Sequence, residues 1–445
     1  MNRQTNRRTF LKQSSVAGAG VMILRSGILK AGQSPNEKLN IAVIGCGGRG
    51  RANIKGVEGE NIVALCDVDE QALAAAAAQF PRAKTYVDWR RCLEQKDIDA
   101  VACSTTDHTH AFINVWAMNR GKHVYCEKPL ANSVHEARVV RQTYLKNKRK
   151  LATQMGTQIH ASDNFRRMVE LVRHGAIGTV KDARVWCSRT PEGGNYLPEV
   201  KPVPKHIHWD LWIGPSPFHP YNPGYFRSEQ IAGCLKWNRF WDFGSGQVGD
   251  MGSHLIDMAY WALDLRFPTT CEAKGTPIHP DTCPQWLTAE WDHPANDWRP
   301  AVKVYWYDGG KKPGMPSKIF NRDEMFRCAI FSGDKGFLIV DYGYRVLMPK
   351  LDSDMTQYKP SKPAELIPPS PGHHEEWIIG CKTGKPTLCN FDYSGALIEH
   401  NLLALVAYRL GKKLRWDARN LKATNCPEAD QYIRKTYRRG WVLNG

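Results

Sequence analysis

The chain has 445 residues, of which 42% are hydrophobic and 24% charged, and its formal net charge is +17. This composition is ordinary for a globular protein, and it excludes a mostly disordered chain, a collagen-like fibre and a polytopic membrane protein. The length predicts two or three domains, with cores large enough to need no disulfides.

The basic charge is uneven along the chain. The first 31 residues hold six basic residues and no acidic ones, so 55 basic and 44 acidic residues lie beyond them, a balance of +11. A basic surface without further meaning is one interpretation, and attraction to acidic sugars such as uronates is the sharper one. Nucleic-acid binding is not expected, because no basic stripe accompanies a binding motif. The 13 cysteines include no C-x-x-C pair, which argues against zinc-knuckle and thioredoxin-like sites.

The N-terminus carries a predicted export signal. Arg7-Arg8 lies in a segment, Asn6–Lys12, that is similar to the twin-arginine signal, and the apolar stretch Ser14–Leu24 is too short to span a bilayer permanently. We predict a signal peptide over 1–31, a linker over 32–38, export of the folded chain to the periplasm and no stable membrane span after processing. A chance Arg-Arg pair and an uncleaved anchor are the alternatives.

The next segment has the pattern of a dinucleotide-binding domain. Leu39–Ile44 is an apolar run typical of a buried parallel strand, and a G-x-G-x-x-G follows it directly. Such glycines permit a tight turn and let the backbone approach a pyrophosphate at a helix N-terminus. A second strand, Ile62–Cys66, ends at Asp67, whose carboxylate can bind ribose hydroxyls and would repel a 2′-phosphate. The pattern predicts NAD rather than NADP, although Asp67 could also be a turn residue. The predicted cofactor contacts of this segment are Gly45, Gly47, Gly48, Arg49, Gly50 and Asp67.

Strands and helices continue to alternate up to residue 155. Alternation of this kind implies a doubly wound parallel sheet, so residues 39–155 are predicted to form a Rossmann domain. The further elements expected are a helix at Gln71–Phe80, a strand near Tyr86, strands at Asp99–Cys103, His123–Cys126 and Leu151–Met155, and helices from Thr105 to Asn119 and from a Ser133 cap to Lys146–Lys150.

The pattern changes after Gly156. Residues 156–445 are predicted to form a substrate-binding α/β domain, in which residues 190–243 are rich in proline, glycine and aromatic residues. Trp237, Arg239 and Trp241 in this stretch could stack on a sugar and hydrogen-bond its hydroxyls, while packing of the loop against the sheet is the alternative. The elements expected are a helix at Asp163–His174, strands at Val180–Arg189, Ala301–Trp306 and Gly336–Val340, and an apolar helix at Asn401–Leu410.

Two short motifs contain residues suited to proton transfer. Glu127-Lys128-Pro129 follows the strand His123–Cys126, so Lys128 is expected in the crevice where a doubly wound sheet binds ligands. Asp250 and His254 are four residues apart in a predicted helix and share a face with Asp257. A histidine suits acid–base work near neutral pH. Taken alone, each motif could equally be structural.

The glycine-rich turn, Glu127-Lys128-Pro129 and Asp250-x-x-x-His254 occur in this order, and together they resemble the Gfo/Idh/MocA oxidoreductase family. The likeness is greatest to exported bacterial members with a tryptophan-rich middle segment. The resemblance implies a Rossmann domain joined to an α/β domain with a large open, mostly antiparallel sheet. That sheet commonly forms the interface of a homodimer or homotetramer.

The resemblance also implies roles for individual residues. Lys128 and His254 are the expected catalytic pair, and Asp250 is expected to position substrate. The residues expected on the nicotinamide side of the cofactor site are Thr105, Asp107, His108, Glu127 and Lys128.

Some histidines remain ambiguous at this level. His108 and His110 could be cap and core residues instead of pocket residues. Gln158 and His160 follow the last Rossmann strand and could reach the substrate. His373 and His374 lack acidic partners at a metal-binding spacing, so no metal site is predicted.

These roles predict an NAD-dependent enzyme that oxidises a carbinol of a sugar, polyol or glycoside, with His254 as the base and Lys128 assisting at the oxygen. One alternative is a redox-neutral glycosidase or lyase that oxidises a sugar, eliminates the aglycone and then reduces the product. The other is a non-enzymatic, cofactor-loaded sugar-binding protein. An exported enzyme would need tightly bound NAD, because the periplasm is not expected to hold a useful pool of the free cofactor.

Overall fold

The computed structural model describes residues 38–444 except 201, 227–235, 315–324, 351–352, 355–357, 360–361 and 363–365. The predicted signal peptide and nearly all of the linker therefore lie outside the described residues. Residues 39–445 form one compact unit. Among the described residues, no helix is both long enough and apolar enough to cross a bilayer.

The first half is a Rossmann fold, as predicted. Its six strands are all parallel and lie in the order β3-β2-β1-β4-β5-β6. The central strands have no exposed face, which explains why they read as short apolar runs. The elements are β1 (Asn40–Ile44), α2 (Gly48–Val57), β2 (Asn61–Cys66), α3 (Glu70–Ala77), β3 (Lys84–Tyr86), α4 (Trp89–Cys92), β4 (Ala100–Cys103), α5 (Asp107–Asn119), β5 (His123–Cys126), α6 (Val134–Asn147) and β6 (Thr153–Met155).

The second half contains a nine-stranded sheet in the order β13-β12-β11-β7-β10-β9-β8-β14-β15. Only the pair β7–β10 is parallel, so the predicted mostly antiparallel sheet is confirmed. The strands are β7 (Val180–Cys187), β8 (Thr270–Gly275), β9 (Leu287–His293), β10 (Val302–Tyr307), β11 (Arg327–Gly333), β12 (Gly336–Val340), β13 (Arg345–Pro349), β14 (Leu414–Asp417) and β15 (Lys422–Ala423).

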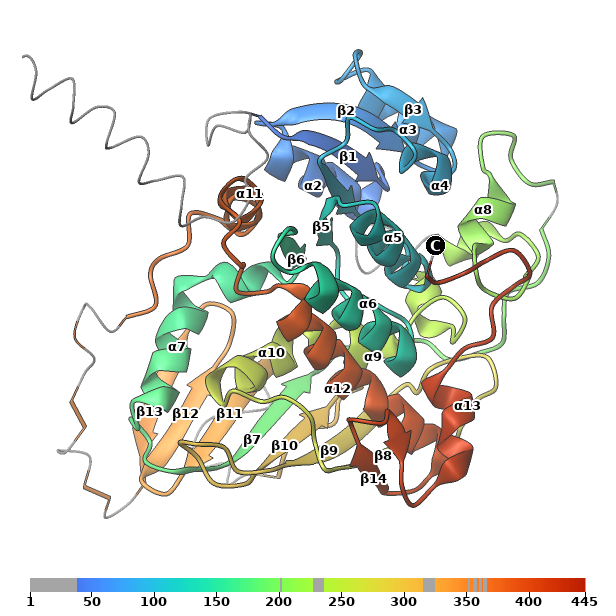
Figure 1. Cartoon of the computed structure of the whole chain (residues 1–445). Coiled ribbons are helices and arrows are strands. Elements are labelled where there is room, and N and C mark those ends of the chain that lie inside the picture. Colours follow the sequence, from blue (N-terminus) through green and yellow to red (C-terminus); the bar gives the residue numbers. More distant parts are fainter. Residues whose placement is uncertain are drawn as a thin grey trace, which may run out of the picture. The chain divides into compact units, whose positions relative to one another are not determined.

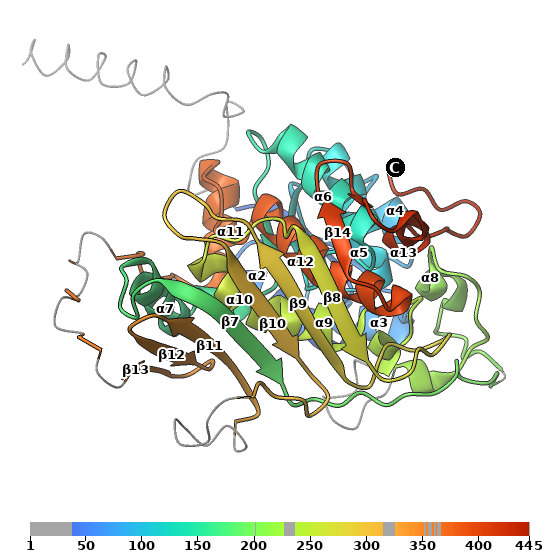
Figure 2. The same cartoon turned by 90° about the horizontal axis from the view of Figure 1, so that it is seen from below.

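Helices cover one face of this sheet, and no described helix covers the other (Figures 1 and 2). Burial alternates along β9 and β10, which is the pattern of a sheet with one packed face and one partly exposed face. The helices of this half are α7 (Asp163–Arg173), α8 (Trp209–Ile213), α9 (Gly246–Asp250), α10 (Gly252–Ala262), α11 (His373–Thr383), α12 (Phe391–Leu410) and α13 (Asp430–Ile433), with short 3₁₀ turns η1 (Gln158–Ala161), η2 (Pro223–Tyr225), η3 (Lys236–Arg239) and η6 (Pro427–Ala429).

The two halves are joined through α6 and α12, which pack against each other. Arg138 of α6 donates to both carboxylate oxygens of Glu399 of α12, at 2.8 and 2.6 Å, inside this contact. One hydrophobic cluster includes residues of both halves. The shared core fixes the carboxyl ends of the Rossmann strands against the start of α10, where the candidate site lies.

Several predicted boundaries are corrected by the structure. The closing helix is twice as long as expected, because α12 begins at Phe391, where Asn390 caps it, rather than at Asn401. The predicted helix carrying Asp250 and His254 is two helices, α9 and α10, which meet at Met251. The Ser133 cap is confirmed, since its hydroxyl accepts from the Glu136 backbone N–H at the start of α6.

Candidate active site

A cavity of about 720 Å³ lies where the two halves meet. This volume falls in the range of small-molecule and cofactor sites. The Rossmann half contributes the turn after β1 and the ends of β2, β4 and β5. The second half contributes the start of α10 and part of the aromatic-rich stretch within residues 190–243, called the aromatic loop below. Its lining includes Gly45, Gly47, Gly48, Arg49, Asp67, Thr105, Asp107, Glu127, Lys128, Gln158, Arg189, Trp212, Tyr221, Phe226, Trp237, Asn238, Asp250 and His254.

The glycine-rich turn is packed too closely for side chains. A Cβ atom on Gly45 would lie 2.6 Å from the Ser104 carbonyl oxygen, and one on Gly50 would lie 1.9 Å from the Gly45 carbonyl oxygen. Gly45 also has φ +89°, a conformation that other residues rarely adopt. Gly45, Gly47, Gly48 and Arg49 line the cavity, whereas Gly50 is buried beneath the turn. The turn therefore presents bare backbone and the N-terminus of α2 to a ligand, as a pyrophosphate requires.

Asp67 lies beside this turn at the end of β2. Its carboxylate accepts from the backbone N–H groups of Cys46 and Gly47, at 2.7 and 3.2 Å, and from that of Asp69 at 2.9 Å. Burial raises the pKa of Asp67 despite these three bonds. The carboxylate is thus held in a fixed orientation on the cavity wall, where it can accept from a ribose hydroxyl. The residues present fit a dinucleotide with an unmodified ribose.

Lys128 is the centre of an ion-pair cluster. Its ammonium group donates to Asp250, and the same carboxylate accepts from Nη1 of Arg189 at 3.1 Å. Burial disfavours the charge of Lys128, but the carboxylates of Asp250 and then Asp107 outweigh burial and raise its pKa. The pKa of Asp250 is lowered, because Lys128 and Arg189 overcome the effect of its burial. At neutral pH the cluster is therefore a carboxylate shared by two cations.

His254 lies in the first turn of α10, next to this cluster. Burial, followed by the charge of Lys128, lowers its pKa to about 3, although Asp250 acts in the opposite direction. The imidazole is consequently neutral at physiological pH, as a general base must be before it takes a proton. Nδ1 lies 3.1 Å from Oγ1 of Thr157, and Nε2 has no hydrogen-bond partner among the described residues.

Two further acidic residues occupy the walls. Burial raises the pKa of Asp107 to about 7, and Nδ2 of Asn238 donates to its carboxylate at 3.1 Å. Glu127 accepts through one oxygen from Arg49, Asn53 and Gln158, at 3.0, 3.0 and 2.9 Å. A Cβ atom on Gly156 would lie 2.7 Å from the Glu127 carboxyl carbon, so a glycine is needed where the carboxylate rests.

The remaining predicted site residues divide into those that line the cavity and those that do not. Gln158, Trp237 and Thr105 line the cavity. His108, His160, Arg239 and Trp241 are not among its lining residues, and each is at most 9% exposed.

The four excluded residues have partners that explain their positions. The ring of His108 lies between the carbonyl oxygens of Trp212 and Phe243, at 2.9 and 3.3 Å, so it joins α5 to the aromatic loop. Arg239 donates to Glu192 at 2.6 Å, and the Trp241 indole N–H donates to the His279 carbonyl at 3.0 Å. The expectations that these residues contact cofactor or substrate are not supported by their positions.

His160 and Asp257 pair with each other in the core. Nδ1 of His160 lies 2.8 Å from the carboxylate of Asp257, which also accepts from the Tyr393 hydroxyl at 2.5 Å. The His160 ring stacks on Trp261 with 3.7 Å between centroids. Asp257 lies three residues after His254 in α10, but it is fully buried and does not line the cavity, so it does not join Asp250 and His254 at the candidate site.

Arg189, Thr157 and Asn238 were not singled out by sequence reasoning. Arg189 follows β7, and its partner Asp250 is 61 residues away. Thr157 follows β6, and it meets His254 97 residues later. Asn238 lies in η3. For Thr157 the one available signal was its position after a strand of the parallel sheet, because ligands of doubly wound sheets gather at strand ends.

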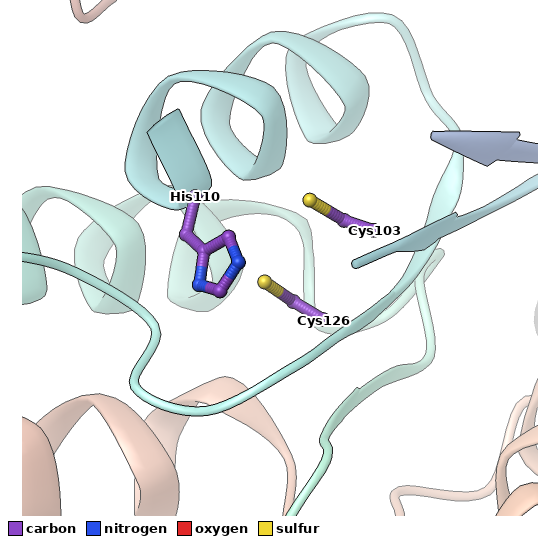
Figure 3. Close-up of side chains that lie close together, drawn as sticks. All are labelled: Cys103, His110 and Cys126. Carbon is purple, nitrogen blue, oxygen red and sulfur yellow. The ribbon is translucent and has the colours of Figure 1, made fainter. Parts of the chain in front are cut away.

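Cys103, His110 and Cys126 form a buried cluster (Figure 3), of which His110 also lines the cavity. Burial raises the pKa of a thiol, but hydrogen bonding with Cys126 and the charge of His110 bring that of Cys103 down to about 6. Both ring nitrogens of His110 face carbonyl oxygens, Nδ1 that of Pro129 at 2.6 Å and Nε2 that of Thr105 at 3.0 Å. The ring thus lies between the segments after β4 and β5, close to a carbonyl oxygen of each.

Comparison with known proteins identifies both halves. Residues 39–155 match the family model described as the oxidoreductase family with an NAD-binding Rossmann fold, and residues 185–295 match the model of that family's C-terminal alpha/beta domain. Both matches are to the Gfo/Idh/MocA oxidoreductase family.

Curated relatives match over part of their length. A protein named "Glycosyl hydrolase family 109 protein" from Solibacter usitatus is 39% identical over 152 residues, 30% of this chain and 35% of the relative. "Inositol 2-dehydrogenase" from Klebsiella pneumoniae is 29% identical over 175 residues, 38% of this chain and 52% of the relative. The aligned part of this chain thus spans about a third to a half of these relatives.

A solved structure resembles nearly the whole fold. The WlbA dehydrogenase from Bordetella pertussis, crystallised with NADH and UDP-GlcNAcA, aligns over 86% of this chain and 99% of its own, with a TM-score of 0.59 and 15% identity. At this identity the likeness establishes the fold alone.

Proposed function

The chain belongs to the Gfo/Idh/MocA oxidoreductase family, and from this membership we propose that it is an NAD-dependent enzyme acting on a carbinol of a sugar, polyol or glycoside. The observation that carries the proposal is the contact of Lys128 with Asp250 beside a neutral His254, in the same cavity as the glycine-rich turn. A binding protein without activity would have no need of this acid–base arrangement.

The roles of the residues follow from their charges. His254 is neutral and has an unpartnered Nε2 among the described residues, so it accepts the hydroxyl proton of the carbinol. Lys128 is a cation, and it donates to the same oxygen as negative charge develops there. Asp250 holds the ammonium group in place, Arg189 donates to the same carboxylate, and both Asp250 and Arg189 can bind a neighbouring hydroxyl. Trp237 and the other aromatic residues of the wall offer faces for the C–H groups of a sugar ring.

The dinucleotide is expected along the Rossmann side of the cavity. Gly45, Gly47, Gly48 and Arg49 would hold its pyrophosphate, and Asp67 its ribose. When bound, the nicotinamide supplies the acceptor for the hydrogen that leaves the carbinol carbon. Thr105, Asp107, Glu127 and Lys128 line the same cavity, and we expect them on the nicotinamide side of the cofactor.

A second candidate is the redox-neutral glycosidase or lyase. It is favoured by one observation, namely that a relative named as a glycosyl hydrolase matches this chain at 39% identity. The same Lys128 and His254 would serve both reactions, because removal of a proton from a carbinol begins each of them. The two candidates differ in whether reduced dinucleotide accumulates.

Absorbance at 340 nm separates the candidates. Purified protein with NAD is mixed with myo-inositol, levoglucosan and p-nitrophenyl glycosides, and both absorbance at 340 nm and nitrophenol release are followed. A steady rise at 340 nm supports the dehydrogenase. Nitrophenol release without that rise supports the redox-neutral enzyme. Stoichiometric binding of a sugar with neither signal would favour the binding protein instead.

Export is proposed from the sequence alone, on the Arg7-Arg8 signal. If the folded chain is exported to the periplasm, NAD must be bound before export and regenerated in place, by a second sugar or by a redox-neutral cycle. We expect the exported form to retain dinucleotide after extensive dialysis and to turn over without added NAD. A chain that remains in the cytoplasm, or an exported apoprotein that needs a continuous supply of NAD, would contradict this proposal.

A homodimer or homotetramer is proposed through the partly exposed face of the nine-stranded sheet. Tyr305 and Tyr307 lie on this face of β10, and burial there is incomplete. Sedimentation velocity at micromolar concentration tests the proposal, with a 50.3 kDa particle as the contrary result.

A further inference from the structure

The hydroxyl of Thr157 lies between two groups that compete for its single proton. Oγ1 is 3.2 Å from the backbone carbonyl oxygen of Ser253 and 3.1 Å from Nδ1 of His254. Thr157 is fully buried, so water does not replace either partner. Only one assignment of protons makes both of these contacts hydrogen bonds at once.

The carbonyl of Ser253 can accept but cannot donate. In that assignment the Thr157 hydroxyl donates its proton to Ser253, which leaves an oxygen lone pair facing Nδ1 of His254. A lone pair on Nδ1 would repel that oxygen, whereas an N–H would bond to it. From this we infer that Thr157 is a positioning residue for the proposed reaction, which fixes His254 as the Nδ1–H tautomer and leaves Nε2 bare as the base.

The surroundings hold Thr157 where this requires it. Its backbone N–H donates to the Met155 carbonyl at 2.8 Å, and its own carbonyl accepts from the His160 N–H at 3.1 Å. The next turn, η1, is joined to α10 by the contact of His160 with Asp257 at 2.8 Å. The turn after β6 and helix α10 are thus joined by two contacts, Thr157 with His254 and His160 with Asp257. A shift of the turn relative to the helix would disturb both.

The tautomer matters because neutral imidazole has one N–H and one lone pair. An orienting acceptor at one ring nitrogen decides which nitrogen can take a proton. Without the Thr157 oxygen, the tautomer with its proton on Nε2 would become available. In that tautomer Nε2 has no lone pair and cannot take the proton of the substrate hydroxyl. The protonated ring formed during the reaction would also lose an acceptor for its Nδ1–H in a buried place, where an unmade hydrogen bond is costly.

The test compares Thr157→Val, which has nearly the same shape but no hydroxyl, with Thr157→Ser, which keeps the hydroxyl. This inference rests on the proposed function for its kinetic part. With whichever of myo-inositol, levoglucosan or p-nitrophenyl glycosides the wild type turns over, kcat of Thr157→Val should fall about tenfold to a hundredfold. KM and the dissociation constant of NAD should change little, and Thr157→Ser should keep most of the turnover.

A spectroscopic measurement needs no substrate and so separates failure of this inference from failure of the proposed function. In ¹⁵N-histidine-labelled wild type, the His254 signals are assigned as those that His254→Asn removes. Their ring-nitrogen shifts should show the proton on Nδ1, and in Thr157→Val the proton should move to Nε2. An Nε2–H tautomer in the wild type would overturn the inference even if Thr157→Val does not fold. Wild-type kcat in a folded Thr157→Val would overturn it as well.

Discussion

Two histidine contacts join the turn after β6 to helix α10. They differ in their access to the cavity and in the charged groups around them. At the cavity end, His254 of α10 meets Thr157, next to Lys128 and Asp250. At the core end, His160 of η1 meets Asp257 of α10, stacks on Trp261 and is fully buried. Each contact includes a histidine with an aspartate nearby, Asp250 for His254 and Asp257 for His160. The comparison teaches that access to the cavity and neighbouring charges, not residue types, distinguish the proposed catalytic histidine from the buried one.

The largest effects are expected when the residues at the cavity and the histidine in the core are substituted separately. Lys128→Met and His254→Asn should lower turnover by about 10²–10⁴-fold while NAD still binds, because each removes a group that acts on the reacting oxygen. His160→Asn is the matched control, expected to lower stability but to leave kcat of the folded fraction near wild type. Steady-state kinetics with dinucleotide titration checks all three. Near-wild-type turnover in the Lys128 or His254 variant would remove that residue from the mechanism.

Acid should destabilise the protein steeply. Burial lowers the pKa of His254 and His373 to about 3 and that of His108, His123 and His400 to about 4. These rings are neutral when folded and gain protons on unfolding below about pH 6.5, so their contribution to stability is lost as pH falls from 6.5 towards 4.

Two buried carboxyls act against this trend. Burial raises the pKa of Asp107 and Asp308 to about 7, so both hold a proton in the folded state that they lose on unfolding near pH 5. These five histidines and two aspartates together take up about three protons net on unfolding, and their contribution to the free energy of unfolding should fall by about 4 kcal/mol for each pH unit around pH 5. Urea midpoints at pH 7, 6 and 5 measure this. A flat profile would show that these histidines are charged or solvated in the folded protein.

The core end of the comparison is tested by Asp257→Asn. The substitution keeps the shape but removes the charge that faces His160 and the Tyr393 hydroxyl. We expect the free energy of unfolding to fall by about 3 kcal/mol, as when one partner of a buried pair is lost. Denaturant unfolding at pH 7 measures the change. A loss below about 0.5 kcal/mol, within the range of a surface substitution, would mean that the core pair is not structural.

The smallest expected effect concerns cofactor choice. Asp67 should make NAD bind at least about tenfold more tightly than NADP, a difference of about 1.4 kcal/mol, because its fixed carboxylate repels a 2′-phosphate. Asp67→Asn should reduce this preference for NAD over NADP. Fluorescence titration with both cofactors checks the prediction, and equal affinities in the wild type would refute the role assigned to Asp67.

Much of the fold was predictable because its signals are local. The glycine-rich turn, Asp67 and the strand ending before Glu127 each lie within a short stretch, and all fall where the parallel sheet requires. The length of α12 was missed because its first ten residues contain glycine, serine and buried polar residues such as Glu399, which hide an apolar pattern. The break at Met251 has no proline, and its local signal is the pair of glycines on either side, Gly249 and Gly252.

The site was predictable only in part, because some of its contacts join distant segments. Lys128, Asp250 and His254 were identifiable from motifs, but Arg189 and Thr157 became visible only once β7 and β6 were placed beside α9 and α10. His160, Arg239 and Trp241 show the reverse error. Their chemistry suits a sugar, yet Asp257, Glu192 and His279 use their polar groups inside the protein.

The central claim is that hydrogen leaves a carbinol carbon for a dinucleotide held beside Lys128 and His254. The direct measurement uses a sugar that the protein turns over, deuterated at its ring carbons, with protein in excess and the reaction quenched during the first turnover. The account predicts reduced dinucleotide one mass unit heavier by mass spectrometry, whether the reaction ends in net oxidation or in a redox-neutral cycle, and none of it with His254→Asn. Sugar turnover without deuterium in the dinucleotide would contradict the account.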